Sequence, residues 1–512
     1  MSRRLSFPFA TALVLLLVAS LPAFGEEWGF LGARYQGMGG AGVAVVNDEH
    51  ASYWNPGALA FGGRHGVALP VSIQAAAEGT ILRDVDEVAT FLDGLAAGEF
   101  DQLIDVLQTG DVLSGAQLAT ALELAAVRLP GLDEPGEGLI TTVNASLLMR
   151  HERVAITGIG QGYFGADPVF DRVNLSLSNL NGAAAIDQLI NPGTAMDRYG
   201  PGLAPGVVAD LQEIFTDAMS GNPNLQAEEL VFQAESAGVN VSDPGVVQAI
   251  LDLATATASP SANSFVDNNS GAFIRGLAVE EVGVAYGHPL PFWGERIGLG
   301  ANLKYMYGTT FNKFVRYNDI DSGGDLVDEL TSANNRETTH TVSLDLGLLV
   351  KPYDWLHFGL TARNVTSPEF NLARDPSDPA GKSKLTLDPQ VRAGAAIWVL
   401  PNWVVAFDAD LTKNESELLD GYESQIVSLG TEFGIPIGPV GLALRAGAYV
   451  NAASNTPEAI ALTGGLGLEI FGFNLDLAVG ASPKTEEVEA VNDQTIPSRL
   501  NASVMISYRQ EF

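Results

Sequence analysis

Residues 37–59 read GMGGAGVAVVNDEHASYWNPGAL, and the organisation of the chain is best understood from this stretch. It is dense in glycine and contains an asparagine–proline pair near its end. The residues that we expect to shape this segment are Gly37, Gly39, Gly40, Gly42, Asn47, Asp48, Asn55 and Pro56. Glycine-rich backbone turns sharply and packs closely against other backbone. Irregular backbone is tolerated at membrane depth only where protein or a lumen covers it. We therefore predict that residues 26–62 form a plug, or hatch, inside a β-barrel formed by residues 63–512.

An export signal precedes the predicted plug. Arg3 and Arg4 provide positive charge, residues 10–20 form an apolar core, and Ala23-Phe24-Gly25 is a small-x-small cleavage site. The sequence thus predicts a signal peptide over residues 1–25. Arg3 and Arg4 also partly match a twin-arginine signal. The apolar run is shorter than the roughly 20 residues that a transmembrane helix needs.

Composition narrows the class of protein. The chain has 512 residues, a formal net charge of −34, 56 glycines and no cysteine. The length fits either several soluble domains of roughly 150 residues or one large barrel. The lack of cysteine excludes a disulfide framework and Cys-based zinc sites, and the acidic balance argues against nucleic acid as a partner. No later apolar run is long enough for a spanning helix, so a membrane location requires a closed β-barrel.

Period-two alternation in the second half of the chain supports such a barrel. The clearest case is Phe471, Phe473, Leu475, Leu477 and Val479, which alternate with Gly472, Asn474, Asp476, Ala478 and Gly480. Similar patterns occur over residues 297–307, 342–348 and 356–361. One apolar and one small or polar face suit a barrel wall between lipid and lumen. A soluble β-sandwich would give the same pattern, because its apolar face meets a second sheet.

Connection lengths separate the two alternatives. We predict fourteen antiparallel strands near residues 63–76, 138–150, 152–165, 271–287, 295–316, 336–351, 354–366, 384–399, 402–412, 422–434, 439–451, 458–470, 472–482 and 498–512. Short connections alternate with long ones, apart from residues 452–457, as they do in outer-membrane barrels. Both ends of the barrel would then lie on the periplasmic side. The last strand carries Tyr508 and ends on Phe512, which we interpret as a signal for the barrel-assembly machinery, although Gln510 interrupts the pattern.

The two longest connections, residues 77–137 and 166–270, are predicted to be helical insertions on the outer side. Apolar stretches with helical spacing cover residues 84–107 and 116–127 in the first insertion. The second contains an apolar stripe of Val207, Leu211, Ile214, Phe215 and Met219. These helices either pack into a small extracellular domain or form a groove in which a hydrophobic ligand first binds.

Charged side chains are predicted to line the lumen. On the strand registers above, the inward-facing charged residues are Lys304, Asp345, Arg363, Arg392, Asp408, Asp410, Glu432, Arg445, Glu469 and Asp476. Opposite charges in one enclosed space can pair and fill the bore. The alternative is a polar conduit for hydrophilic solutes.

Other chemistry has little support in the sequence. Gly37, Gly39 and Gly42 form a Gly-x-Gly-x-x-Gly motif, but a dinucleotide site also needs a preceding buried strand and a following helix. The six histidines are scattered, with none paired at metal-ligand spacing, and no catalytic constellation is present. Residues 319–325 only partly match a calcium loop, because Leu330 stands where the bidentate glutamate is needed. We predict no enzymatic activity, no cofactor and no metal.

The plug motif resembles that of a known family. The segments Gly37–Ala44, Asn47-Asp48 and Tyr53–Leu59 are similar to the N-terminal signature of the FadL-like superfamily, and in particular to its TraF-like branch, named after conjugal transfer. Residues 359–368 are similar to a mid-barrel segment of that branch, whereas Gly57 stands where the family more often has alanine. The resemblance implies a fourteen-stranded outer-membrane barrel with a lumenal plug. In its transporting members, hydrophobic molecules bind at outer loops, move the plug and leave through the wall into the bilayer.

Three functions follow as alternatives. The first is passive uptake of hydrophobic small molecules, such as fatty acids or hydrocarbons, across the cell outer membrane. The second is a non-transporting partner in assembly, secretion or conjugation, and the third is a diffusion porin for polar solutes. In each case we expect the protein to contact outer-membrane lipid and lipopolysaccharide and the barrel-assembly machinery.

Overall fold

A computed structural model describes residues 28–95, 128–171, 269–291, 293–316, 335–376, 382–453, 460–488 and 494–511, together with positions 102, 117, 120, 124 and 231. Among these residues no helix is both long and apolar enough to cross a bilayer. The predicted signal peptide, the candidate groove of residues 207–219, the calcium-like loop and Phe512 lie outside the described residues.

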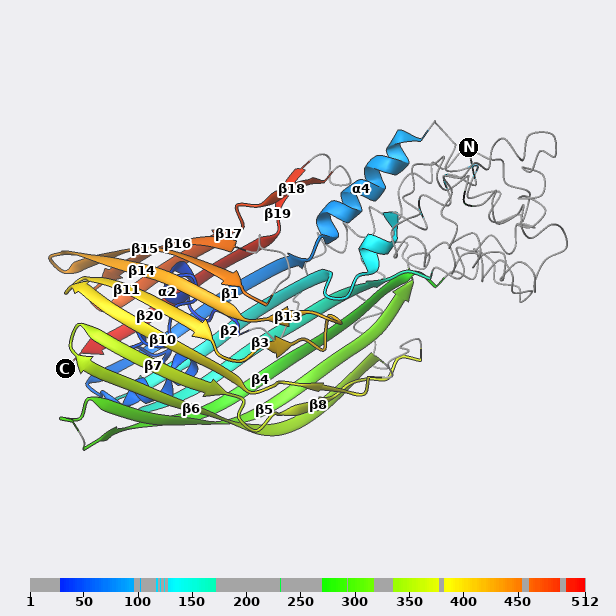
Figure 1. The fold of residues 1–512 in the computed structure, drawn as a ribbon. Helices are drawn as coiled ribbons and strands as arrows, with labels where there is room; N and C mark the ends of the chain where they lie inside the picture. Colours follow the sequence, from blue (N-terminus) through cyan, green and yellow to red (C-terminus); the bar gives the residue numbers. More distant parts are fainter. Residues whose placement is uncertain are drawn as a thin grey trace, which may run out of the picture.

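Fourteen antiparallel strands form a closed barrel, which confirms the predicted fold class (Figure 1). The strands are β1 (Arg64–Glu78), β2 (Gly138–His151), β3 (Val154–Val169), β4 (Gly271–Leu290), β5 (Ile297–Arg316), β6 (Arg336–Tyr353), β7 (Leu356–Arg363), β10 (Gln390–Leu400), β11 (Trp403–Asp410), β14 (Ile426–Ile437), β15 (Val440–Asn451), β16 (Ile460–Ile470), β17 (Phe473–Ala481) and β20 (Arg499–Glu511). Neighbours in sequence pair with one another, and β1 pairs with β20 to close the ring. Closure rules out the soluble sandwich, which has two separate sheets.

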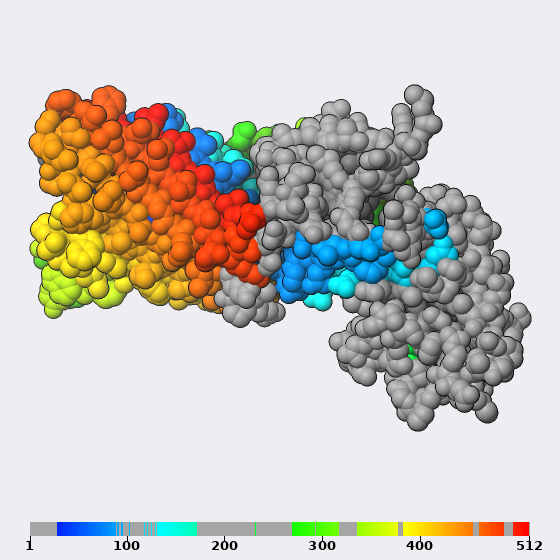
Figure 2. All heavy atoms as spheres, turned by 90° about the horizontal axis from the view of Figure 1, so that it is seen from above, coloured from blue at the N-terminus to red at the C-terminus, as the bar shows by residue number. Residues whose placement is uncertain are grey.

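The strand connections lie at two distinct ends of the barrel. The short-turn end holds residues 152–153, 291–296, 354–355, 401–402, 438–439 and 471–472, and the start of β1 and the end of β20 also lie there (Figure 1). Phe471 and Gly472 both have positive φ, of 50° and 83°, as a two-residue turn of a twisted hairpin requires. The other end is the long-loop end, where the helix α4 (Ile81–Gly94) extends beyond the barrel (Figure 2).

The outer surface of the barrel is an apolar band. Leu303, Val342 and Val479 are each about 60% exposed, at 63%, 59% and 65%, and they alternate with buried residues along their strands. Exposed aromatic residues gather at the short-turn end, namely Tyr286, Trp293, Tyr353, Trp355, Trp403, Phe471 and Phe473. An apolar band with an aromatic girdle is the surface that a barrel presents to lipid.

The long-loop end differs from the prediction in several details. Three two-stranded hairpins lie there: β8 (Glu369–Asn371) with β9 (Lys384–Thr386), β12 (Asn414–Glu415) with β13 (Glu423–Ser424), and β18 (Thr485–Val488) with β19 (Gln494–Pro497). Of these strands, β8, β12, β18 and β19 fall in residues predicted as loops. The predicted strand 354–366 ends at Arg363, because Asn364 and Ser367 have positive φ and turn the chain. The predicted strands 384–399 and 422–434 start later, at Gln390 and Ile426, since their first residues belong to these hairpins.

The first insertion is described only in part. Its helix α4 covers Ile81–Gly94, whereas the sequence predicted a helix over 84–107, and most of the second predicted helix lies outside the described residues. A 3₁₀ turn, η3 (Pro130–Asp133), packs near α4 before β2 begins. The apolar side of α4 contacts this turn through Ile81, Leu82, Val85 and Val88, together with Leu132.

Candidate functional site: the plug and the lumen

The segment before β1 lies inside the barrel. It contains α2 (Ala33–Gly37), α3 (Ala51–Trp54) and the 3₁₀ helix η1 (Pro56–Ala60), all of them buried. Its core is aromatic: the Trp28 and Trp54 rings stack with centroids 6.2 Å apart, and the Tyr53 hydroxyl donates to the Gly29 carbonyl at 2.6 Å. Short helices cannot hold such a chain by themselves, so packing against itself and the wall must fix its shape.

The glycines of the plug allow close packing. Gly39 and Gly40 have left-handed backbone, with φ of 67° and 84°, a conformation that other residues adopt at a cost. A Cβ atom on Gly40 would lie 2.3 Å from the Phe30 ring, and one on Gly42 would lie 2.4 Å from the Trp54 ring. These positions therefore have a packing reason for glycine.

Asn55 joins the plug to the barrel wall. Its side-chain oxygen accepts from the Gly57 amide at 2.9 Å, and its side-chain nitrogen donates to the carbonyls of Val43 and Leu348 at 2.9 and 3.0 Å. Pro56 follows at the first position of η1, where its fixed φ and missing N–H are tolerated. This pair thus sets the turn by which the plug leads toward β1.

A glycine-lined seat in the wall receives the plug, and sequence reasoning missed it. The seat comprises the inward positions Gly287, Gly298, Gly300, Gly347, Gly359, Gly394, Gly430, Gly447 and Gly465, spread over eight of the nine neighbouring strands from β4 to β16. A Cβ atom on Gly300 would lie 2.1 Å from the Pro56 carbonyl oxygen, and one on Gly430 would lie 2.1 Å from that of Met38. Gly57 faces the same wall, and a Cβ atom on it would lie 2.8 Å from the Gly298 carbonyl oxygen. This crowding explains glycine at a position where the family more often has alanine. Glycines on the inward face of several predicted strands were the available signal.

Ion pairs hold the plug at one side of the wall. Arg34 binds both carboxylate oxygens of Glu432 at 2.8 and 2.9 Å, and it also contacts Asn47 and Asp48. Arg509 of β20 pairs with both Asp48 and Glu49. Because bidentate charged contacts of this kind fix orientation as well as distance, they lock the plug against β14 and β20.

Asp48 lies at the centre of this group. Its Oδ2 atom faces the two arginines, and its Oδ1 atom lies 3.0 Å from both the His50 backbone amide and the His50 ring Nδ1. Burial by itself would raise the pKa of the Asp48 carboxyl, but the charges of Arg509, His50 and Arg34 outweigh burial and hold that pKa well below its usual range. Asp48, Glu49 and His50 bring ligand-type atoms within 4.8 Å of one another. The arginines already neutralise these carboxylates, so the arrangement is an ion-pair cluster.

Most of the predicted lumen charges pair with one another. Arg392 binds Asp410, Lys304 lies 3.0 Å from Asp345, and Arg445 bridges Glu432 and Asp476 at 2.6 Å each. Glu281, which the prediction omitted, lies 3.6 Å from Lys304. Glu469 is on the inward register but near the end of β16, where it is exposed. The lumen thus contains a layer of paired charge.

Besides Glu432, three lumen charges contact the plug directly. Asp408 accepts the amides of Gly42 and Val43 at 2.7 and 2.8 Å, so its carboxylate is bound by plug backbone. The guanidinium of Arg363 lies 4.0 Å from the Tyr53 ring centroid, and that of Arg392 lies 4.6 Å from the Trp28 ring centroid. Cations over aromatic faces are attracted by the ring electrons. The aromatic core of the plug is therefore fitted to the charged layer.

An apolar layer of packed side chains, called the apolar compartment below, lies between the charged layer and the long-loop end, and the sequence did not reveal it. Inward residues of β3, β4 and β5 meet residues from the loops of 364–389 and 411–425, giving the cluster Tyr163, Leu277, Val279, Met306, Phe370, Leu372, Leu385, Leu387 and Leu418. Along β4 the inward residues change from Leu277 and Val279 to Glu281 and then to Ala285. The lumen is consequently layered as apolar, charged and glycine-lined.

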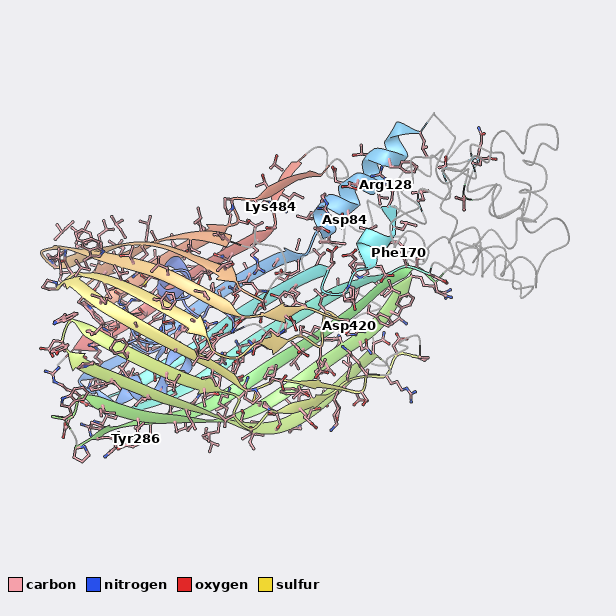
Figure 3. The ribbon with its side chains drawn as sticks, viewed as in Figure 1. Asp84, Arg128, Phe170, Tyr286, Asp420 and Lys484 are labelled. Carbon is pink, nitrogen blue, oxygen red and sulfur yellow. The ribbon has the colours of Figure 1, made fainter. Side chains whose placement is uncertain are left out.

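Ion pairs hold the loops over this compartment. Asp420, labelled in Figure 3 at the long-loop end, pairs with Lys382 and with Arg275 of β4. The hydroxyl of Thr310 donates to the Asn371 carbonyl at 2.6 Å, and the Asn312 side chain donates to the Ala373 carbonyl at 2.9 Å. These contacts fold the loop that carries β8 onto the inner face of β5.

Of the predicted assembly signal, Tyr508 is described. It lies on the outer face of β20 and is 41% exposed, with its ring centroid 4.8 Å from that of Phe473. Its recognition by the assembly machinery stays a prediction.

The chain is similar to several known proteins. The family model described as "F plasmid transfer operon, TraF, protein" matches residues 52–410, which is more than half of the chain. A search of curated proteins finds no match. Among solved structures, the toluene transporter TodX of Pseudomonas putida aligns at 11% identity and a TM-score of 0.39, over 96% of this chain and 99% of that one. The toluene transporter TbuX of Ralstonia pickettii aligns at 11% identity and a TM-score of 0.42, over 96% and 100%.

The family match begins within α3, includes the Asn55-Pro56 exit, and runs through the wall strands to the end of β11. It therefore covers most of the seat as well as the paired charges of β5 to β11. By this match the chain belongs to the TraF protein family of the F plasmid transfer operon.

Proposed function

We propose that this protein resides in the outer membrane and admits hydrophobic small molecules into it. The observation that carries the proposal is the apolar compartment around Leu277, Val279 and Met306. Inward-facing residues of a barrel wall are usually polar. An apolar lining there suits a ligand of fatty-acid or hydrocarbon type, because burial of apolar surface is favourable by about 25 cal/mol per Å².

The layers between the compartment and the short-turn end oppose direct passage of such a ligand to that end. Paired charges and the buried plug lie in that direction. A hydrophobic molecule would lose favourable burial on entering the charged layer. Movement of the plug or lateral exit into the bilayer, as the sequence resemblance implies, would avoid that cost.

Binding of a labelled fatty acid and of an aromatic hydrocarbon to purified protein tests the proposal. Leu277→Gln places an amide in the compartment and should weaken binding by about tenfold, since an unpaired buried amide costs roughly 1–3 kcal/mol. Leu346→Gln is the matched control, because Leu346 faces outward on β6 and is 43% exposed. Absence of saturable binding to the wild-type protein, with no uptake defect on gene deletion, would sink the proposal.

The second candidate is a non-transporting partner in conjugation or secretion, and the family description favours it. The binding experiment separates the two, because a docking protein needs no affinity for a hydrophobic small molecule. A diffusion porin is the third candidate, and the buried plug and paired lumen charges speak against it.

A further inference from the structure

Two histidines far apart in sequence meet at the short-turn end of the barrel. His65 is the second residue of β1 and His151 is the last of β2, and the two are direct cross-strand partners. Their Nδ1 atoms lie 2.8 Å apart, and their ring centroids are 4.4 Å apart. The pair lies just after the plug joins the wall, outside the plug and lumen.

The distance between the ring nitrogens suits a shared metal ion. Two imidazole nitrogens on one tetrahedral zinc, with Zn–N bonds of about 2.0–2.1 Å, are about 3.3 Å apart. The Nδ1 atoms therefore need to separate by only about half an ångström to admit the ion. Strand pairing fixes both Cα positions, so small ring rotations supply this change.

A carboxylate supports His65 from behind. The Nε2 atom of His65 lies 3.5 Å from one carboxylate oxygen of Glu152. The other Glu152 oxygen accepts a hydrogen bond from the Gly63 amide at 3.2 Å. A histidine that binds metal through one nitrogen commonly donates its other N–H to a carboxylate, which fixes the tautomer and raises ligand basicity. Glu152 is placed to do this for a metal at the Nδ1 atom.

We propose that His65 and His151 bind a divalent transition-metal ion of the zinc class through their Nδ1 atoms, with Glu152 as the positioning carboxylate. Neutral imidazole suits zinc, copper and nickel, and water would complete the coordination. Each ring binds the ion as its Nε2–H tautomer, so a proton carried on either Nδ1 atom before binding moves to the Nε2 atom of the same ring. The bound ion links β1 to β2 where the plug leaves the wall. This inference does not depend on the transported molecule.

Calorimetric titration of the tag-free full chain with Zn²⁺ tests the site. The wild-type protein should bind one ion saturably, and His65→Ala and His151→Asn should each lose that binding. Glu152→Gln should weaken it by about 10–100-fold, as is usual for a partner behind a metal ligand. Zn²⁺ should also raise the Tm of the wild-type protein and leave that of His65→Ala unchanged.

His340→Ala is the matched control. His340 is likewise exposed on a strand, but its ring faces the Tyr305 hydroxyl and not a second imidazole. Its loss should leave Zn²⁺ binding intact. Equal Zn²⁺ binding by the wild-type protein and by folded His65→Ala or His151→Asn, or no saturable binding at all, would overturn the proposal. Faster gel migration of unheated than boiled sample shows that each variant is folded.

Discussion

At the scale of single residues, Gly40 shows how the plug depends on the absence of a side chain. Its φ is 84°, and a Cβ atom would lie 2.3 Å from the Phe30 ring. Gly438 in a short turn also has positive φ, of 64°, but nothing lies within 4 Å of its Cβ position. The two glycines share a left-handed backbone but differ in crowding.

Alanine at these two positions should therefore destabilise the protein unequally. Gly438→Ala should cost about 1–2 kcal/mol, the strain of a left-handed alanine. Gly40→Ala should cost about 1–3 kcal/mol more, because it also overpacks the plug core. Denaturant unfolding in detergent micelles measures both. Equal losses for the two variants would show that crowding around Gly40 is unimportant.

Glu137, just before β2, should make stability depend on pH. Burial raises the pKa of its carboxyl to about 7, although the Thr80 amide and hydroxyl bind it, and Asp84 and Glu134 add to the rise. The folded protein therefore holds a proton that the unfolded chain releases at a lower pH. The resulting stability is fully present below the unfolded pKa of about 4.5 and is lost as pH rises through about 7.

The Tm should accordingly fall between about pH 5 and pH 8, and Glu137→Gln should flatten that change. Glu295→Gln serves as the control, since Glu295 is exposed in a short turn at the other end of the barrel. A pH profile of Glu137→Gln that matches the wild-type profile would assign the dependence to other groups.

At the scale of elements, the plug is held mainly by buried charge. Arg34 of α2 binds Glu432 of β14 through two contacts and Asp48 through a third. Its removal leaves Asp48 and Glu432 buried with one fewer cation, and breaking a buried pair typically costs 3–5 kcal/mol. No comparable cost is expected for an exposed ion pair, which is typically worth about 0–1 kcal/mol.

Arg34→Ala should thus lower the free energy of unfolding by about 3–5 kcal/mol. Arg296→Ala is the control, because Arg296 pairs with Asp354, whose side chain is 95% exposed. It should cost at most about 1 kcal/mol. Denaturant unfolding of both variants compares them, and a loss for Arg34→Ala as small as that for Arg296→Ala would mean that the ion pairs do not hold the plug.

At the scale of the whole molecule, the lumen is closed by layers from different parts of the chain. The plug fills the short-turn side, and the loops around Leu385 and Leu418 cover the apolar compartment at the other side. Planar-bilayer recordings should therefore show little steady current for the wild-type protein. Combining Arg34→Ala with Arg509→Ala removes both sets of plug ion pairs and should produce larger steady currents. Large currents from the unaltered protein would favour the porin alternative.

The sequence predicted the barrel wall well, because alternation reports which face of a strand meets lipid. Phe473, Leu475 and Leu477 on β17 are exposed as expected, while Asn474 and Asp476 are buried. It predicted the layout of the short turns as well, since a two-residue turn such as Phe471-Gly472 carries a local signal. The hairpins β8–β9 and β12–β13 were missed because their short strands are stabilised by the wall that they contact, and not by local pattern.

The sequence alone determined the strand number, the closed barrel and the N-terminal plug. Lipid on one face of each strand and a lumen on the other impose alternation, and closure pairs every backbone group. Tertiary structure decided which lumen charges pair, where the apolar compartment lies, and that His65 meets His151 across 86 residues. The glycine-lined seat for the plug likewise depends on eight strands meeting at one level. Strand register around a closed ring sets these contacts, and register is a property of the assembled barrel.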